Sequence, residues 1–141
     1  MSKVRFVFMT ALITILAACT PATGWLQVND VWARPGLAGG NSAVFFVIEN
    51  GTAGTDSLLS ASSEVASAVE MHMTIMQDGN MQMVYQQEVP VQMGRTEFRP
   101  GGLHVMLIGL NRDLNPGDTF SVTLDFATAG SIPLDVTVSE P

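Results

Sequence analysis

The chain has 141 residues, with six basic and 13 acidic side chains and a formal net charge of −7 at pH 7. A surface this acidic repels phosphate backbones, so a nucleic-acid-binding protein is excluded. The length suits a single domain with one hydrophobic core. Cys19 is the only cysteine, which excludes an internal disulfide.

The amino terminus has the pattern of an export signal. Lys3 and Arg5 precede an apolar run over residues 6–17, which is too short to cross a bilayer of roughly 30 Å as a helix. The run ends in LAAC, which resembles a bacterial lipobox and terminates at Cys19. We therefore expect residues 1–18 to be a signal peptide, cleaved before a lipidated Cys19. The alternative is an ordinary signal peptide with a chance cysteine.

The mature chain is expected to be a tether over residues 19–24 followed by one domain over residues 25–141. It would retain four arginines, no lysine and all 13 acidic residues. Anionic lipid surfaces would not attract such a domain, so we expect the amino-terminal lipid to be its only membrane attachment. Thr20 stands where inner-membrane lipoproteins of bacteria usually carry Asp. This favours a periplasm-facing lipoprotein of the outer rather than the inner membrane.

Short segments with period-two alternation, separated by turn residues, follow the tether. Residues 44–48 form a continuous apolar run, typical of a strand covered on both faces. Farther on, residues 120–126 and 132–138 alternate apolar and polar side chains, so each has one buried and one solvated face. Seven to nine such strands predict an all-β fold, an antiparallel β-sandwich.

Residues 69–83 contain five methionines and one histidine around an Asp-Gly pair. Asp78-Gly79 between alternating segments predicts a two-residue β-hairpin loop. With that loop, the expected cross-strand pairs are Met76 with Met81, Thr74 with Met83, and His72 with Tyr85.

This pairing divides the methionines between two faces of the hairpin. His72 and Met83 become diagonal neighbours on one face, with Cβ atoms about 7–8 Å apart, a gap that two long side chains can close around an ion. Met71, Met73 and Ile75 point to the opposite face, where we expect them to pack in the core.

A second pair of candidate ligands follows a Pro-Gly-Gly turn at residues 100–102. His104 and Met106 are two positions apart on a predicted strand, so they project from one face. Two imidazole nitrogens and two thioether sulfurs could therefore meet, from His72, Met83, His104 and Met106. Thioethers are soft and neutral, and they select Cu(I) over Zn²⁺, Mg²⁺ or Ca²⁺.

Other readings of these residues are less well supported. A blue-copper electron-transfer centre needs a thiolate, and the one cysteine is at the amino terminus. A catalytic zinc site needs three histidine or carboxylate ligands with an open position, which two histidines supply only by recruiting acids. No Ser-His-Asp or Cys-His set indicates an enzyme. A methionine-rich surface that binds a protein partner without metal remains an alternative.

The same residues resemble the signature of the PCu(A)C family of periplasmic copper chaperones. His72-Met73 is followed by Met83 eleven positions after the histidine, and then by His104-x-Met106. The last step is one residue shorter than the common family spacing, so Met81 and Met73 are kept as reserve ligands. The segments NSAVFFVIEN at 41–50 and RPGGLHVMLIGL at 99–110 also match, and the resemblance covers nearly the whole mature chain.

The resemblance implies a cupredoxin-like β-sandwich that binds one Cu(I). The implied ligands are His72, Met83, His104 and Met106. It also implies delivery of copper to the dinuclear CuA centre of cytochrome c oxidase, alone or with Sco-type thiol proteins. Copper storage or tolerance is the alternative role within such a family.

Overall fold

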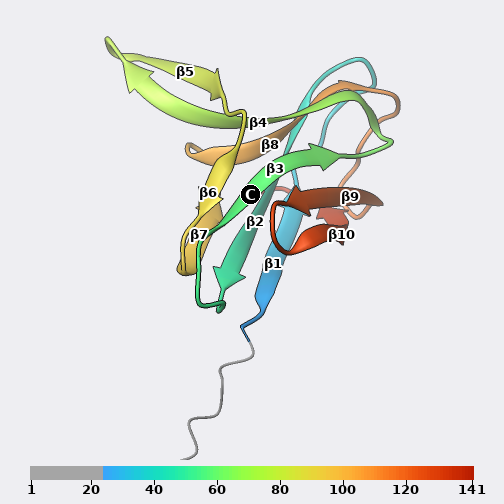
Figure 1. The fold of residues 1–141 in the computed structure, drawn as a ribbon. Coiled ribbons are helices and arrows are strands. Elements are labelled where there is room, and N and C mark those ends of the chain that lie inside the picture. Colours follow the sequence, from blue (N-terminus) through green and yellow to red (C-terminus); the bar gives the residue numbers. More distant parts are fainter. Residues whose placement is uncertain (1–23) are drawn as a thin grey trace, which may run out of the picture.

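The computed structural model describes residues 24–141, which form ten β-strands (Figure 1). Their bounds are β1 Leu26–Ala33, β2 Ser42–Asn50, β3 Asp56–Ser62, β4 Ala66–Gln77, β5 Asn80–Tyr85, β6 Val89–Val91, β7 Gly94–Phe98, β8 Leu103–Leu110, β9 Thr119–Phe126 and β10 Gly130–Val138. The predicted signal peptide and lipobox, with Cys19, lie outside the described residues. Within residues 24–141 there is no helix long and apolar enough to span a membrane.

The strands form one hydrogen-bonded ladder in the order β5-β4-β8-β7-β2-β1-β10-β9-β3-β6. The predicted all-β class is confirmed. Most pairings are antiparallel, as expected, but β1 with β10 and β7 with β8 are parallel. The alternating pattern of apolar and polar residues identifies each strand. Whether a strand pairs parallel or antiparallel with a strand distant in sequence is decided by how the sheet closes. Here the first and last strands run the same way, with Trp32 opposite Thr137.

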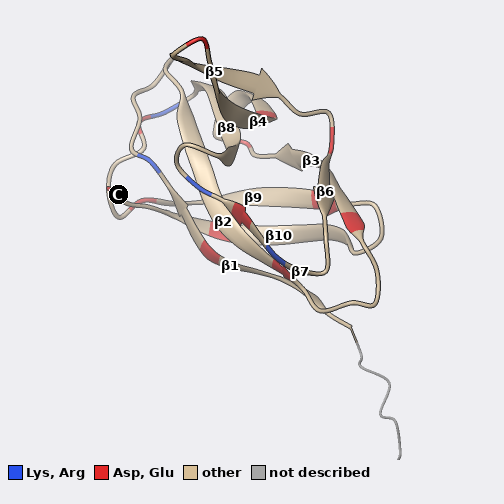
Figure 2. Ribbon diagram, turned by 90° about the vertical axis from the view of Figure 1, so that its left-hand side faces the viewer, with Lys and Arg blue, Asp and Glu red and all other residues tan. Residues whose placement is uncertain are grey.

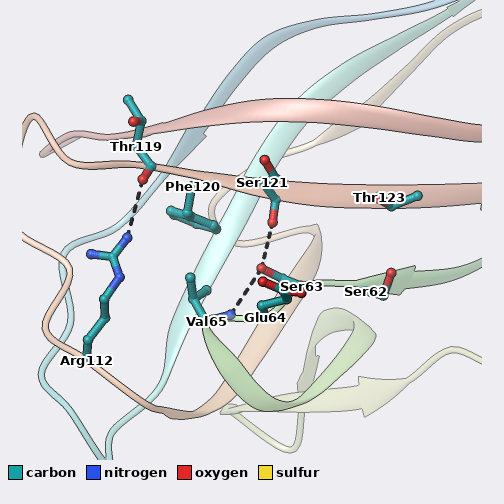
Figure 3. Close-up of a pocket in the computed structure, with 9 residues that line it drawn as sticks. All are labelled: Ser62, Ser63, Glu64, Val65, Arg112, Thr119, Phe120, Ser121 and Thr123. Atoms are coloured by element: carbon teal, nitrogen blue, oxygen red, sulfur yellow. Dashed lines mark hydrogen bonds between the residues drawn. The ribbon is translucent and has the colours of Figure 1, made fainter.

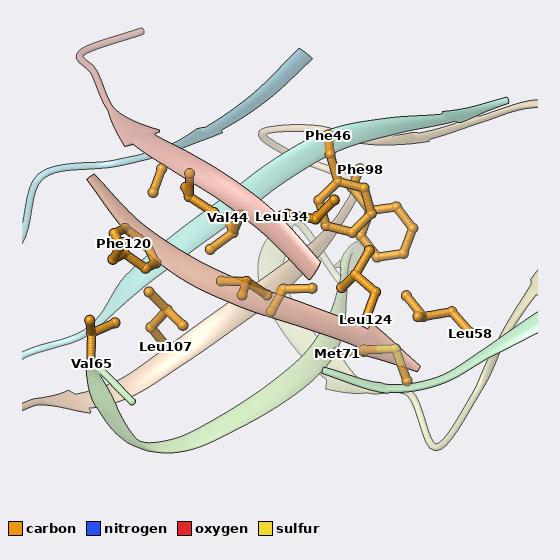
Figure 4. Packing of buried hydrophobic residues seen from close by; sticks show 14 of the residues in the cluster. Val44, Phe46, Leu58, Val65, Met71, Phe98, Leu107, Phe120, Leu124 and Leu134 are labelled. Carbon is orange, nitrogen blue, oxygen red and sulfur yellow. The ribbon is translucent and has the colours of Figure 1, made fainter. Parts of the chain in front are cut away.

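The ladder curls so that its two halves face each other across one apolar core (Figure 4). β2 contributes to both faces, and residues 44–48 are all buried, as the continuous apolar run predicts. The alternating strands β9 and β10 supply the opposite side of the core, including Leu124 and Val136. β8 contributes Val105 and Leu107. Burying one face of each of these strands leaves the other face of β8 free for polar side chains.

The β4–β5 hairpin has the predicted turn and register. Asp78 and Gly79 both adopt positive φ angles, 50° and 79°, as a type I′ turn requires. Each expected pair is present, including Met76 with Met81. The pairing of β4 with β8 ends at Met73, so the rest of the hairpin extends beyond the sheet body (Figure 1).

The expectation that Met71, Met73 and Ile75 all pack in the core is only partly confirmed. Met71 is 3% exposed and packs in the core as predicted, but Met73 is half-buried outside the core cluster and Ile75 is 38% exposed. Ile75 lies past the last β8 partner, so no strand covers the inner face of the hairpin there.

Asp56 anchors the start of β3 to the turn between β9 and β10. Its buried carboxylate accepts hydrogen bonds from the backbone N–H groups of Ser57, Thr128 and Ala129 at 2.8, 2.8 and 2.9 Å. Burial alone would raise the pKa of Asp56, but these hydrogen bonds outweigh it and hold the pKa below its ordinary 3.8. The ionised carboxylate therefore stabilises the folded state.

We expect Asp56→Asn to lower the free energy of unfolding by about 1–3 kcal/mol near neutral pH, because buried N–H donors lose a charged acceptor. In the unsubstituted protein this stabilisation is present above pH 3.8 and is lost as the pH falls through the lower pKa of the folded state. Urea unfolding at about pH 7 and about pH 3 measures both effects. Asp135→Asn, on the exposed side of β10, is the matched control. Equal stabilities of the two variants at neutral pH would contradict the expectation.

Candidate metal centre

The two histidines of the chain are direct partners across β4 and β8. The ring centroids of His72 and His104 lie 5.9 Å apart, with one ring edge toward the other. Their neighbours Met71 and Val105, also paired, point into the core. Strand alternation therefore places both imidazoles on the outer face of the sheet, directly behind the core.

One nitrogen of each ring is held by a hydrogen-bond acceptor. Nε2 of His72 lies 2.8 Å from a carboxylate oxygen of Glu70, and Nδ1 of His104 lies 3.0 Å from the carbonyl oxygen of Gly102. Because both partners are acceptors, these nitrogens carry the proton in the neutral rings. The lone pair is then on Nδ1 of His72 and on Nε2 of His104. Metal-binding histidines are commonly oriented in this way.

The two remaining nitrogens are buried without a partner. Within residues 24–141, His72 Nδ1 and His104 Nε2 are the buried side-chain N or O atoms that lack a hydrogen bond. A buried polar atom without a partner costs free energy, and such atoms are rare in folded proteins. Two of them on rings whose centroids lie 5.9 Å apart fit a metal ion that would bind both nitrogens.

His104 keeps its lone pair at lower pH than an ordinary histidine. Burial lowers the pKa of His104, and this outweighs the hydrogen bond to Gly102, which raises it. The positive charges of protonated His72 and of Arg34 lower the pKa further. A histidine must be deprotonated to bind a metal, so the shift preserves a ligand as the pH falls below 6.5.

Two adjoining cavities bring thioethers to His104. One, of about 170 Å³, is bordered by His104, Met83 and Met106. The other, of about 120 Å³, is bordered by His104, Met83 and Met81. Met83 and His104 thus belong to both. Three of the predicted donors, Met83, His104 and Met106, therefore border these cavities together with Met81, whereas His72 borders neither and is connected to them through its cross-strand partner His104. Met73 directly follows His72, so its side chain projects from the opposite face of β4.

The sequence analysis missed one residue at this centre. Arg34 borders both cavities, and its guanidinium lies 5.4 Å from the ring centroid of Phe45, which in turn faces His104. The residue follows β1, far from the histidines in sequence. Its surroundings in the sequence, VWARP at 31–35, contain no metal-binding pattern that would single it out. Acidic residues, by contrast, are spread over several sides of the molecule (Figure 2).

A larger cavity, of about 710 Å³, lies away from the histidines between the end of β3 and β9 (Figure 3). Serines and threonines line most of it. Ser63 donates a hydrogen bond to the backbone carbonyl of Ser121, and Arg112 donates to that of Thr119. These polar groups are engaged with the backbone, and none of the lining residues is a histidine that could activate a serine.

Over the part of the chain that the structure describes, no three His, Cys, Asp or Glu side chains gather to hold a metal.

The family described as "Putative lipoprotein LpqE-like" matches residues 26–138, which is nearly all of the described chain. The chain belongs to the LpqE-like family. This LpqE-like chain is 32% identical over 120 residues to the "Putative lipoprotein Lxx21020" of Leifsonia xyli subsp. xyli, a match that covers 82% of this chain and 70% of the relative.

Solved structures place the LpqE-like fold among PCuAC domains. The copper-bound PCuAC domain from PmoF2 has a TM-score of 0.67 at 23% identity, covering 82% of this chain and 93% of that one. The solution structure of Cu(I)-DR1885 from Deinococcus radiodurans has a TM-score of 0.61 at 24% identity, covering 84% and 81%. The predicted cupredoxin-like sandwich and the resemblance to the PCu(A)C family are confirmed.

The hydrogen bonds of the two rings predict one tautomer for each histidine in the metal-free protein. We expect His72 as the Nε2–H form and His104 as the Nδ1–H form in ¹⁵N-resolved NMR spectra of the imidazoles above pH 7. Glu70→Ala should turn His72 into a mixture of tautomers, whereas Glu70→Gln should preserve the Nε2–H form because its amide oxygen still accepts. His104, which is held by a backbone carbonyl, is the internal control. A mixture at His72 with Glu70 intact would contradict the assignment.

Proposed function

We propose that this chain is a Cu(I) carrier of the periplasm, anchored in the outer membrane through a lipidated Cys19. The observation that carries the proposal is the pair of buried, unpartnered nitrogens, His72 Nδ1 and His104 Nε2, of which His104 shares a cavity with Met83 and Met106. The lipobox sequence and the lipoprotein names of the family and its Leifsonia relative support the anchor. The copper named for the PmoF2 and DR1885 structures supports the choice of metal.

The donor set favours the reduced ion. Two neutral imidazoles and two thioethers are soft enough to select Cu(I) over harder cations, and they bring no thiolate that could itself be oxidised to a disulfide. The carboxylate of Glu70, hydrogen-bonded to His72, adds a negative charge that partly offsets the charge of the ion. It does so without occupying a coordination position.

The exposure of the ligands suits transfer rather than permanent binding. His104 is 4% exposed, whereas Met83 is 59% exposed on the edge strand β5. A partner can therefore approach the thioether side and replace the ligands one at a time. Because copper transfer makes and breaks no covalent bond of the protein, the proposed role is that of a carrier and not of an enzyme.

We expect one tight equivalent of Cu(I) in an anaerobic titration of residues 20–141, which contain all ten strands, against a competing chelator. Alanine at His72, Met83, His104 or Met106 should each weaken binding by about 100-fold or more, since loss of a residue that only orients a ligand already costs about 10–100-fold. Met93→Ala is the matched control, because Met93 is 62% exposed on the segment between β6 and β7 and borders neither cavity at His104. Binding that ignores all four substitutions would leave a methionine-rich interaction module without a metal site.

The proposed recipient is the CuA centre of cytochrome c oxidase, with Sco-type proteins as possible intermediaries. When the Cu(I)-loaded protein is mixed with a metal-free CuA domain without oxygen, we expect copper to leave the carrier. The purple absorption of the mixed-valence CuA centre should then develop when a one-electron oxidant such as ferricyanide is added. Met106→Ala, which removes a ligand of the histidine centre, should release copper faster than the unsubstituted protein. Retention of copper in the presence of excess CuA domain would instead favour storage or copper tolerance.

A further inference from the structure

Three thioethers are exposed on one face of the β4–β5 hairpin. Met76, Met81 and Met83 are 68%, 67% and 59% exposed, in contrast to Met71 on the other face, which is 3% exposed. Exposing three long apolar side chains together has a cost in water, and such a group usually marks a binding function. Strand alternation puts them on the same face as His72.

The register lets the three sulfur atoms converge. Met76 and Met81 are direct cross-strand partners, so their Cβ atoms lie about 4.5–5.5 Å apart. Met83 is two positions along β5 from Met81 and diagonal to Met76, about 7–8 Å away between Cβ atoms. Each methionine has three rotatable bonds, enough for the sulfurs to meet at one ion. Three neutral, soft donors would select Cu(I).

The hairpin group is continuous with the histidine centre. Met81 and Met83 border the 120 Å³ cavity together with His104, and Met83 also borders the 170 Å³ cavity with His104 and Met106. Met83 therefore lies between the exposed methionines and the buried imidazoles. Asp78, which carries a carboxylate, lies in the turn at the outer end of the β4–β5 hairpin.

We propose that Met76, Met81 and Met83 form a second Cu(I) site, through which copper enters and leaves the histidine centre. The proposal rests on the proposed function. In the inward step the Cu–S bonds to Met76 and Met81 break, and bonds to His72 Nδ1, His104 Nε2 and the sulfur of Met106 form. Met83 stays bound throughout. Copper remains Cu(I), and the neutral rings take up or release no proton at their free nitrogens.

A transit site has a kinetic signature that distinguishes it from a ligand of the final centre. It lowers the barrier for entry and exit equally, and so changes both rates while leaving the equilibrium affinity of the final centre unaltered. A residue that ligates copper in the final centre would instead change the affinity. A surface used only to dock a partner protein would change neither quantity with a small chelator.

The first test compares the full chain, purified in detergent, with Met76→Leu/Met81→Leu and with the control Met93→Leu. Leucine keeps the apolar volume and removes the sulfur, and both positions are solvent-exposed, so the fold is preserved. Stopped-flow exchange with a Cu(I) chelator should show loading and unloading slowed by about tenfold each in the double variant, with an unchanged dissociation constant. Unchanged rates, or a weakened equilibrium affinity with an unchanged loading rate, would overturn the proposal.

The second test isolates the hairpin site from the histidine centre. In a His72→Asn/His104→Gln background, one weaker equivalent of Ag(I), used as a redox-inert substitute for Cu(I), should shift the methyl NMR signals of Met76, Met81 and Met83. Introducing Met76→Leu and Met81→Leu into this background should abolish that binding. If the unsubstituted protein bound no tight equivalent of Cu(I) while the hairpin signals still responded, the proposed function alone would be refuted. A tight histidine centre without hairpin binding would refute the second site alone.

Discussion

The direct pairing of His72 with His104 across β4 and β8 is the constraint on which the proposed metal centre depends. Antiparallel partners on one face are held at a separation set by the backbone ladder rather than by side-chain contacts. On the opposite face the same register packs Met71 against the core beside Val105. A slip of one residue would turn the histidines inward and expose the core residues, so core packing and the histidine pair enforce each other.

Around this pair, the protein fixes which nitrogen of each ring is free. Glu70 and the Gly102 carbonyl each occupy one ring nitrogen, and both cavities border the imidazole of His104. The metal-free protein bears the cost of two unpartnered buried nitrogens, which an ion would remove. Such a centre is organised before the ion arrives, so little further ordering of the ligands opposes binding.

The proposed ligands differ in exposure as well as in chemistry. The histidines lie on strands with sheet partners on both sides, whereas Met83 lies on the edge strand β5 of an arm that extends past β8. A buried half and an exposed half suit the proposed carrier, because the ion must be held and yet remain accessible to a competing ligand. The exposed methionines beyond Met83 extend that accessible half along the hairpin.

Local chemistry determined much of this protein from sequence alone. Asp78-Gly79 defined the turn because its positive φ angles suit few other pairs, and period-two alternation then set the hairpin register and the shared face of His72 and Met83. The soft donors likewise indicated Cu(I). The tertiary structure alone decided that His72 lies opposite His104 and which nitrogen of each ring has no hydrogen-bond partner. It also decided that Arg34 lies at the centre, that Ile75 is exposed and that β1 runs parallel to β10. Each of these depends on strands distant in sequence, whose pairing is set by closure of the sheet around its core and leaves no local pattern to read.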